Sequence, residues 1–164
     1  MIIEKEIIVN KNIAQAWKAL GTDFANAHVW ASPLSHSQGS GSKFNGSECN
    51  ERSCDIKGMG KTREKLLQFS NDSHSLSYEV LEGMPSGVKN ATNTWQLTST
   101  GQDQSKLQMR MDIQLGGIMG TLMQPMMRMM MSKMGNTLVE DFKYYVENGQ
   151  PHPRKIKAMQ KAKS

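Results

Sequence analysis

Two residues of opposite charge, Arg52 and Glu64, are the strongest candidates for chemistry in this sequence. The turn centred on Gly58 lies midway between them, so we predict that they face each other on adjacent antiparallel strands. A buried glutamate can act as a general acid or base, and an arginine can hold an oxyanion or a carboxylate. The pair therefore indicates proton transfer on a small molecule as one possible activity.

The next turn, centred on Asp72, predicts which face of the strands is buried. It places Glu64 opposite Val80 and Leu66 opposite Tyr78, so the apolar face also carries the charged pair. Two further explanations of the pair remain open. The charges could serve only each other as a buried ion pair, or they could anchor the polar head group of a ligand.

The same register extends the inner face to further polar residues. It places Gln68 opposite Leu76, and it brings Glu48 and Asn50 to the inner side. Polar groups on an apolar face require water or ligand atoms as partners. We therefore expect an internal site that is polar at one end and apolar at the other.

Charge and short motifs exclude several classes of function. Five of the 20 basic residues follow Pro153, and the remaining basic residues equal the 15 acidic ones in number. We therefore expect no specific nucleic-acid binding and a flexible basic tail over residues 151–164. Cys49 and Cys54 have neither zinc-site spacing nor a geometry for pairing on one strand. No P-loop, dinucleotide fingerprint or Ser-His-Asp order occurs, so we expect neither a cofactor nor a metal.

A methionine-rich stretch over residues 119–148 predicts a long amphipathic helix. Pro125 fits its first turn, and Gly149 and Pro151 end it. The predicted buried stripe is Met123, Met127, Met130, Met134, Leu138, Phe142 and Tyr145. Flexible thioethers indicate either an ordinary core, a wall facing an apolar ligand, or an exposed groove for peptides. We expect no membrane span, because Arg128 and Lys133 interrupt the run.

The rest of the chain predicts one α+β domain over residues 1–150. An edge strand over residues 2–9 precedes two short helices, over residues 11–20 and 24–29, and a Ser/Gly-rich loop over residues 32–42. Five meandering strands follow, over residues 44–55, 61–69, 75–82, 90–98 and 106–115. The last of them alternates apolar and polar residues with period two. A long amphipathic helix after so many strands must lie against their sheet.

This order resembles the START-like, or helix-grip, superfamily, which includes lipid-transfer proteins, pollen-allergen-like proteins and polyketide cyclases. The residues that carry the resemblance are Val9-Asn10, Trp17, residues 24–30, Arg52, residues 63–67, Ser77-Tyr78, Glu82-Gly83, Trp95 and Gly120. The resemblance implies a curved antiparallel sheet wrapped around the C-terminal helix, an apolar cavity between them, and a mouth at the two short helices. It is also similar to the lachrymatory-factor-synthase-like branch, which implies catalytic roles for Arg52 and Glu64.

We therefore expect this protein to bind a small hydrophobic or amphipathic molecule in an internal cavity. A cyclase, dehydratase or isomerase that uses Glu64 and Arg52, and a protein-interaction module that uses the methionine-rich helix, are the alternatives. His28 and His36 would lie near the mouth. No charged-then-apolar leader follows Met1, so we expect a cytoplasmic protein, and a monomer or weak homodimer. The expected ligand-binding residues are Trp30, Asn50, Leu66, Tyr78, Asn93, Trp95, Met109, Met111, Met123, Met127, Met130 and Met134.

Overall fold

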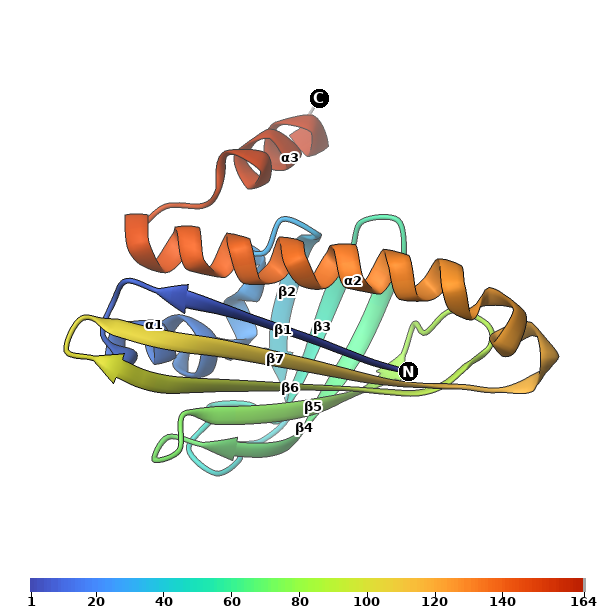
Figure 1. The fold of residues 1–164 in the computed structure, drawn as a ribbon, viewed down its shortest axis with the longest axis horizontal. Coiled ribbons are helices and arrows are strands. Elements are labelled where there is room, and N and C mark those ends of the chain that lie inside the picture. The colour runs from blue at the N-terminus through green and yellow to red at the C-terminus, as the bar shows by residue number, and fades with distance from the viewer. Residues whose placement is uncertain (164) are drawn as a thin grey trace.

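A seven-stranded antiparallel sheet and one long helix build the structure, a computed structural model that describes residues 1–163 (Figure 1). The strands follow the order β1-β7-β6-β5-β4-β3-β2. The predicted α+β fold class, with a curved sheet and a long C-terminal helix, is confirmed. The strands are β1 Ile2–Val9, β2 Leu34–Ser40, β3 Glu51–Ile56, β4 Gly60–Ser70, β5 Ser75–Glu82, β6 Val88–Gly101 and β7 Gln104–Leu115.

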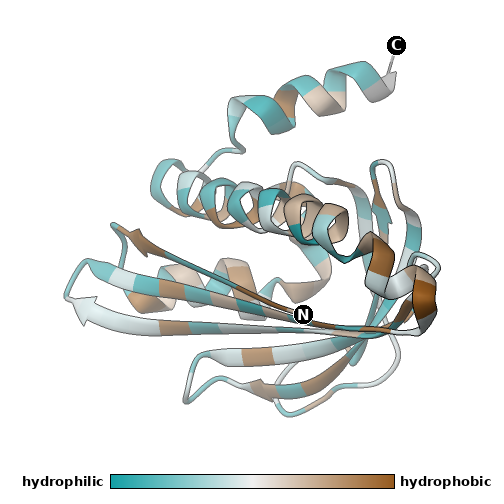
Figure 2. Ribbon diagram, turned by 45° about the vertical axis from the view of Figure 1, so that its right-hand side comes forward, coloured by the Kyte–Doolittle hydropathy of each residue, from teal (hydrophilic) through white to brown (hydrophobic). Residues whose placement is uncertain are grey.

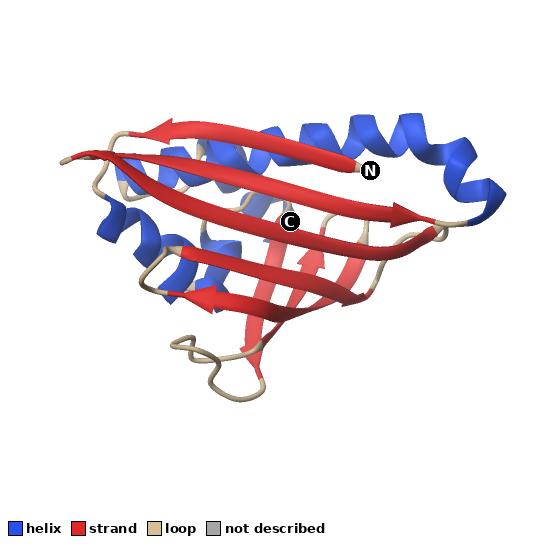
Figure 3. Cartoon of the chain, turned by 60° about the horizontal axis from the view of Figure 1, so that its bottom comes forward, coloured by secondary structure: helices blue, strands red, loops and turns tan. Residues whose placement is uncertain are grey.

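The helices divide into a short group after β1 and a long pair at the C-terminus. They are α1 Ile13–Trp17, η1 Lys18–Thr22, η2 Phe24–Val29, α2 Gly117–Asn148 and α3 Pro153–Lys163. Figure 1 shows that β1, β7 and β6 run along α2, whereas β2 and β3 run across it. Figure 3 shows the same sheet from below, with the short helices and α2 on one side of it. The sheet and α2 therefore enclose an interior between them.

Alternation along β7 produces the inner wall that the sequence predicts. Leu107, Met109, Met111 and Ile113 are buried, whereas Gln108 and Arg110 between them are exposed and Asp112 is half-buried. The strand pairs with β1 on one side and β6 on the other.

The β3–β4 hairpin has the predicted register, and the β4–β5 hairpin departs from it. Arg52 pairs with Glu64 across a turn that contains Gly58 at φ +82°. In the next hairpin a bulge after Leu66 shifts the pairing, so that Phe69 and not Gln68 lies opposite Leu76. The bulge turns the Phe69 ring into the core, where a large apolar side chain loses more water contact than Gln68 would.

Two segments near β3 differ from the sequence prediction. Residues 32–42, predicted as a loop, contain strand β2, which pairs with β3. The predicted strand over residues 44–55 is reduced to β3, because Asn45 and Gly46 adopt positive φ in a tight turn. Glu48 is therefore exposed, and Asn50 accepts a hydrogen bond from the Ser42 backbone N–H outside the interior. The prediction that both point inward is wrong.

The buried stripe of helix α2 agrees with the predicted one only in part: Met127 and Phe142 are buried as predicted, and Met134 and Leu138 line the interior. Met127, Met131, Gly135, Val139 and Phe142 face the sheet. A Cβ atom at Gly135 would lie 2.9 Å from the Met109 Cε atom, so the glycine allows the helix to approach β7 closely. The predicted Met130 is 48% exposed, and Met123 is only half-buried.

The first turns of α2 extend beyond the sheet. The helix begins at Gly117, so Pro125 lies inside it rather than in its first turn, and it lacks the N–H that would bond to the Thr121 carbonyl. Figure 1 shows these turns set at an angle to the rest of α2, a kink that proline explains. Figure 2 shows hydrophobic residues there, where Ile118 is 88% and Leu122 is 74% exposed.

The prediction of a flexible tail over residues 151–164 is wrong for residues 153–163, which form helix α3, and Ser164 lies outside the described residues. Arg154 donates from Nε to the fully buried Asp141 carboxylate of α2 at 2.6 Å. Lys155 is buried and donates from Nζ to the Leu34 carbonyl oxygen at 2.5 Å. Arg154 and Lys155, which the sequence predicts to be in solvent, thus hold α3 against α2 and the start of β2.

Candidate functional site

A cavity of about 150 Å³ lies between the sheet, α2 and the short helices. Its walls are mainly apolar, and side chains from η2, β3 to β7 and α2 contribute to them. Six methionines lie in the lining: Met59, Met84, Met111, Met127, Met131 and Met134. Because thioether chains change rotamer easily, such walls adapt to ligands of different shape.

Arg52 and Glu64 lie together in the wall of this cavity. The Arg52 Nε and Nη2 atoms donate to Glu64 Oε2 at 2.8 Å and 2.6 Å, and each residue is only 6% exposed. Arg52 Nη1 donates to the Phe24 carbonyl oxygen at 2.8 Å. The guanidinium also stacks 4.1 Å from the centre of the Phe24 ring. The arginine is thus fixed on several sides.

The electrostatics of the pair keep Arg52 charged. Burial lowers the Arg52 pKa, whereas the negative charge of Glu64 raises it. The net effect places the Arg52 pKa above its ordinary value. All three contacts of the Glu64 carboxylate, two from Arg52 and one at 3.8 Å from the Cys54 thiol, converge on Oε2. Oε1 takes part in none of them, and Glu64 lines the cavity.

Two neighbours of the pair stay neutral. Burial is the main reason why the Cys54 pKa rises to about 12, so this side chain remains a thiol at neutral pH. Burial, and next the charge of Glu64, raise the Tyr78 pKa above its ordinary value, so the phenol keeps its proton. The Tyr78 hydroxyl accepts a hydrogen bond from Asn93 Nδ2 at 3.0 Å.

The structure brings most of the predicted site residues to one cavity. Those in the lining are Arg52, Glu64, Trp30, Tyr78, Asn93, Trp95, Met111, Met127 and Met134. Leu66 and Met109 are buried in the core beside it. Asn50, Met123 and Met130 lie away from the cavity. The turn at Asn45 and Gly46 shortens the strand before Asn50, and α2 buries a stripe that does not include the two methionines. The lining also contains Phe24 and Met131, which sequence reasoning missed; Met131 is one helical position from the predicted stripe.

The two histidines lie together outside the lining. Their ring centres are 5.5 Å apart, and His28 Nδ1 is 2.8 Å from the Ser37 hydroxyl. Burial lowers the His28 pKa, and His36 and Lys155 lower it further. Among the described residues there is no group of three His, Cys, Asp or Glu side chains placed to hold a metal ion.

A long helix gripped by a curved antiparallel sheet, with an apolar cavity between them, is the architecture of START-like domains. The chain belongs to the family described as polyketide cyclase / dehydrase and lipid transport, whose model matches residues 2–147. No curated protein matches the sequence. No helix in the described part of the chain has the length and apolar character needed to cross a bilayer.

Solved structures with the same fold include enzymes and a protein named only by its superfamily. A START superfamily protein from Mycobacterium smegmatis has a TM-score of 0.73 at 12% identity, covering 91% of this chain and 99% of its own. Truncated norcoclaurine synthase from Thalictrum flavum has a TM-score of 0.72 at 13% identity, covering 90% and 94%. Zhui aromatase/cyclase from Streptomyces sp. R1128 has a TM-score of 0.67 at 12% identity, covering 93% and 99%.

Proposed function

We propose that this protein binds a small apolar or amphipathic molecule in the cavity between α2 and the sheet. The observation that carries the proposal is the combination of soft apolar walls with one buried charged pair in the same lining. Apolar pockets with a few convergent polar groups are the usual form of small-molecule sites. A cavity of about 150 Å³ is large enough for one benzene-sized ring. Larger ligands require the lining methionines to move.

A matched pair of substitutions on α2 tests this proposal. Met134 lines the cavity, whereas Met130, one turn away, is 48% exposed and lies outside the lining. Met134→Trp adds a bulky ring to the cavity wall, so we expect it to abolish uptake of a hydrophobic fluorescent probe. Met130→Trp adds the same ring outside and should leave uptake unchanged. The proposal fails if the native protein takes up no probe, or if both variants bind it equally well.

Proton transfer at Glu64 is a second candidate function, and the free Oε1 atom favours it. Arg52 and Cys54 hold Oε2, so the carboxylate has a fixed orientation and one oxygen left to exchange a proton with a ligand. Arg52 would stabilise negative charge that develops on the ligand. Two neighbours of the same fold, the synthase and the aromatase/cyclase, are enzymes by name.

Deuterium incorporation separates an enzyme from a binder. In D₂O a general base removes a proton from the methyl group next to a bound ketone, and a deuteron returns to the same carbon. We expect acetophenone, a methyl ketone with a single ring, to exchange faster with the native protein than with Glu64→Gln, as followed by NMR. Exchange at the background rate in both proteins, with binding retained, would reject the enzyme and leave the binding function in place.

A further inference from the structure

The first turns of helix α2 expose large apolar side chains to solvent. They follow one another at steps of three and four residues, so they form a stripe on the outer side of the helix, which we call the outer stripe. Its members are Ile118, Met119, Leu122, Met126, Met129 and Met130. Figure 2 shows the hydrophobic start of α2 at the end of the molecule. Exposed apolar patches of this kind mark contacts with a protein or with a membrane.

The loop before β6 fixes the orientation of the outer stripe. Gly120 is buried, and a Cβ atom there would lie 2.9 Å from the Gly87 carbonyl oxygen. The same oxygen accepts a hydrogen bond from the Gly116 N–H at 2.9 Å, directly before α2 begins. Ile118 and Leu122 each lie two residues from Gly120, which is about 200° of helical rotation. Both side chains therefore point away from the loop and from the sheet.

The segments that carry and flank the outer stripe contain basic residues and no acidic ones. Residues 113–139 include Arg128 and Lys133, both exposed, and neither aspartate nor glutamate. Residues 83–102, which pack against the start of α2, include Lys89 and again no acidic residue. A Cβ atom on the N-cap residue of α2 would lie 2.1 Å from Lys89 Cε, so this lysine is close to the stripe. The surface thus combines apolar side chains with positive charge.

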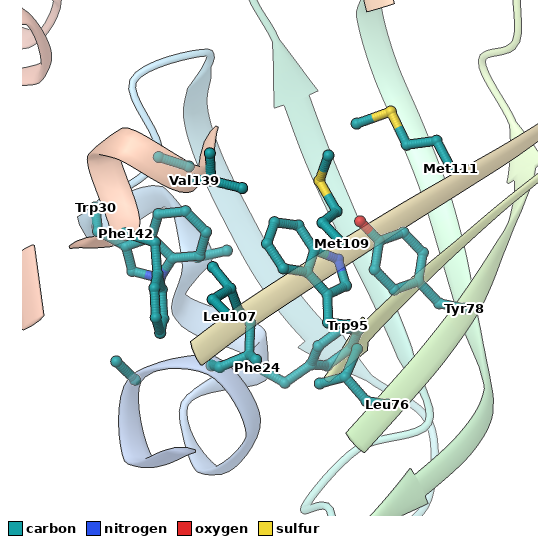
Figure 4. Close-up of a cluster of buried hydrophobic side chains, with 14 of the residues drawn as sticks. Phe24, Trp30, Leu76, Tyr78, Trp95, Leu107, Met109, Met111, Val139 and Phe142 are labelled. Carbon is teal, nitrogen blue, oxygen red and sulfur yellow. The ribbon is translucent and has the colours of Figure 1, made fainter. Parts of the chain in front are cut away.

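Charge and shape together favour a bilayer as the partner of the outer stripe. Two copies of the chain that met through this stripe would bring Arg128 and Lys133 of both together, without acidic residues from residues 113–139 to neutralise them. A helical peptide docks into a concave groove, whereas the stripe lies on the convex outer side of a helix. A bilayer needs no groove, and acidic headgroups complement the basic side chains. Figure 1 shows α3 over the other end of α2, and Figure 4 shows the buried core that the opposite side of the sheet–helix interface contributes.

We propose that the first turns of α2 dock this protein on the surface of a bilayer that contains acidic phospholipids. Ile118, Met119 and Leu122 enter the boundary between headgroups and acyl chains, and Arg128 and Lys133 contact the lipid phosphates. The contact is peripheral, because the helix lies on the bilayer. It uses side chains outside the cavity, so it goes beyond the proposed binding function and is tested separately from it.

Vesicle flotation tests the apolar part of the contact. We expect the native protein to float with vesicles of phosphatidylglycerol and phosphatidylcholine in equal amounts. Ile118→Ser/Leu122→Ser should weaken this binding by roughly tenfold or more, because two apolar side chains no longer enter the bilayer. Both side chains are exposed, so this variant should melt like the native protein. Leu67→Ser changes an exposed leucine on β4 and should bind like the native protein. No binding by the native protein, or equal binding by the stripe variant, would overturn the proposal.

The charged part of the contact and the alternative partner have their own tests. Arg128→Gln/Lys133→Gln should bind the mixed vesicles roughly tenfold more weakly, and native binding to phosphatidylcholine alone should be weaker by a similar factor. Lys65→Gln/Lys106→Gln removes the same charge from the outer face of the sheet and should weaken binding less. Equal weakening by both variants, or equal native binding to both kinds of vesicle, would overturn the proposal. So would a dimer, seen by analytical ultracentrifugation, that dissociates in Ile118→Ser/Leu122→Ser, because a second copy would then cover the stripe.

Discussion

Removing one member of the buried Arg52–Glu64 pair should strongly destabilise the protein. In Glu64→Gln the guanidinium keeps the Phe24 carbonyl and ring but loses the charge that receives two of its N–H groups. In Arg52→Met the Glu64 carboxylate keeps only the weak contact from Cys54. Leaving a buried charge uncompensated costs about 3–5 kcal/mol of unfolding free energy, which lowers the Tm of a domain this size by roughly 6–20 °C.

The double variant decides whether the two charges stabilise each other. Since Arg52→Met/Glu64→Gln leaves no unpaired charge, we expect it to unfold at a higher temperature than either single variant, in a calorimetric double-mutant cycle. Glu48→Gln is the control, because its ion pair with Lys43 has side chains that are 77% and 75% exposed, and it should not change the Tm measurably. Additive single effects would refute the coupling, and single effects as small as the control would refute the burial of the pair.

Three other predictions concern α3, His28 and Cys54. Ending the chain at Gln150 removes the Arg154 partner of the buried Asp141, so unfolding free energy should fall by about 2 kcal/mol in urea titrations; an unchanged midpoint would show that α3 does not contribute. The His28 pKa is lowered from 6.5 in the folded protein, so the unfolded chain binds more protons below that pH, and stability should fall as the pH drops through 6.5. His28→Asn should flatten that dependence, and an equally steep fall would assign it to other groups. Cys54, whose pKa is raised to about 12, should resist iodoacetamide at pH 8 in the native state and react in urea; rapid native alkylation would contradict its burial.

The charged pair was predictable from the sequence because the interactions that place it are local. The Gly58 turn sets the β3–β4 register, and the period of two along each strand then fixes the face. The β4–β5 bulge could not be read in the same way. It depends on the gain from burying the Phe69 ring, which packs against Trp17 from α1.

The stripe on α2 was not predictable in detail because its methionines are too evenly spread. Methionine occupies positions 126, 127, 129, 130 and 131, so several neighbouring stripes look equally apolar. The contact of Gly135 with Met109 on a distant strand selects the observed one. In the same way, β2 lacks an apolar alternation and forms because β3 pairs with it, and α3 depends on a buried aspartate one helix earlier.

The most direct test of ligand binding in the cavity is an NMR titration of protein labelled with ¹³C at the methionine methyl groups. Addition of 4-ethylphenol should shift the methyl signals of the lining residues Met111, Met127, Met131 and Met134. The exposed Met126, Met129 and Met130 on the same helix should stay unchanged. Shifts confined to the exposed methionines, or no shifts at saturating ligand, would contradict a binding site between α2 and the sheet.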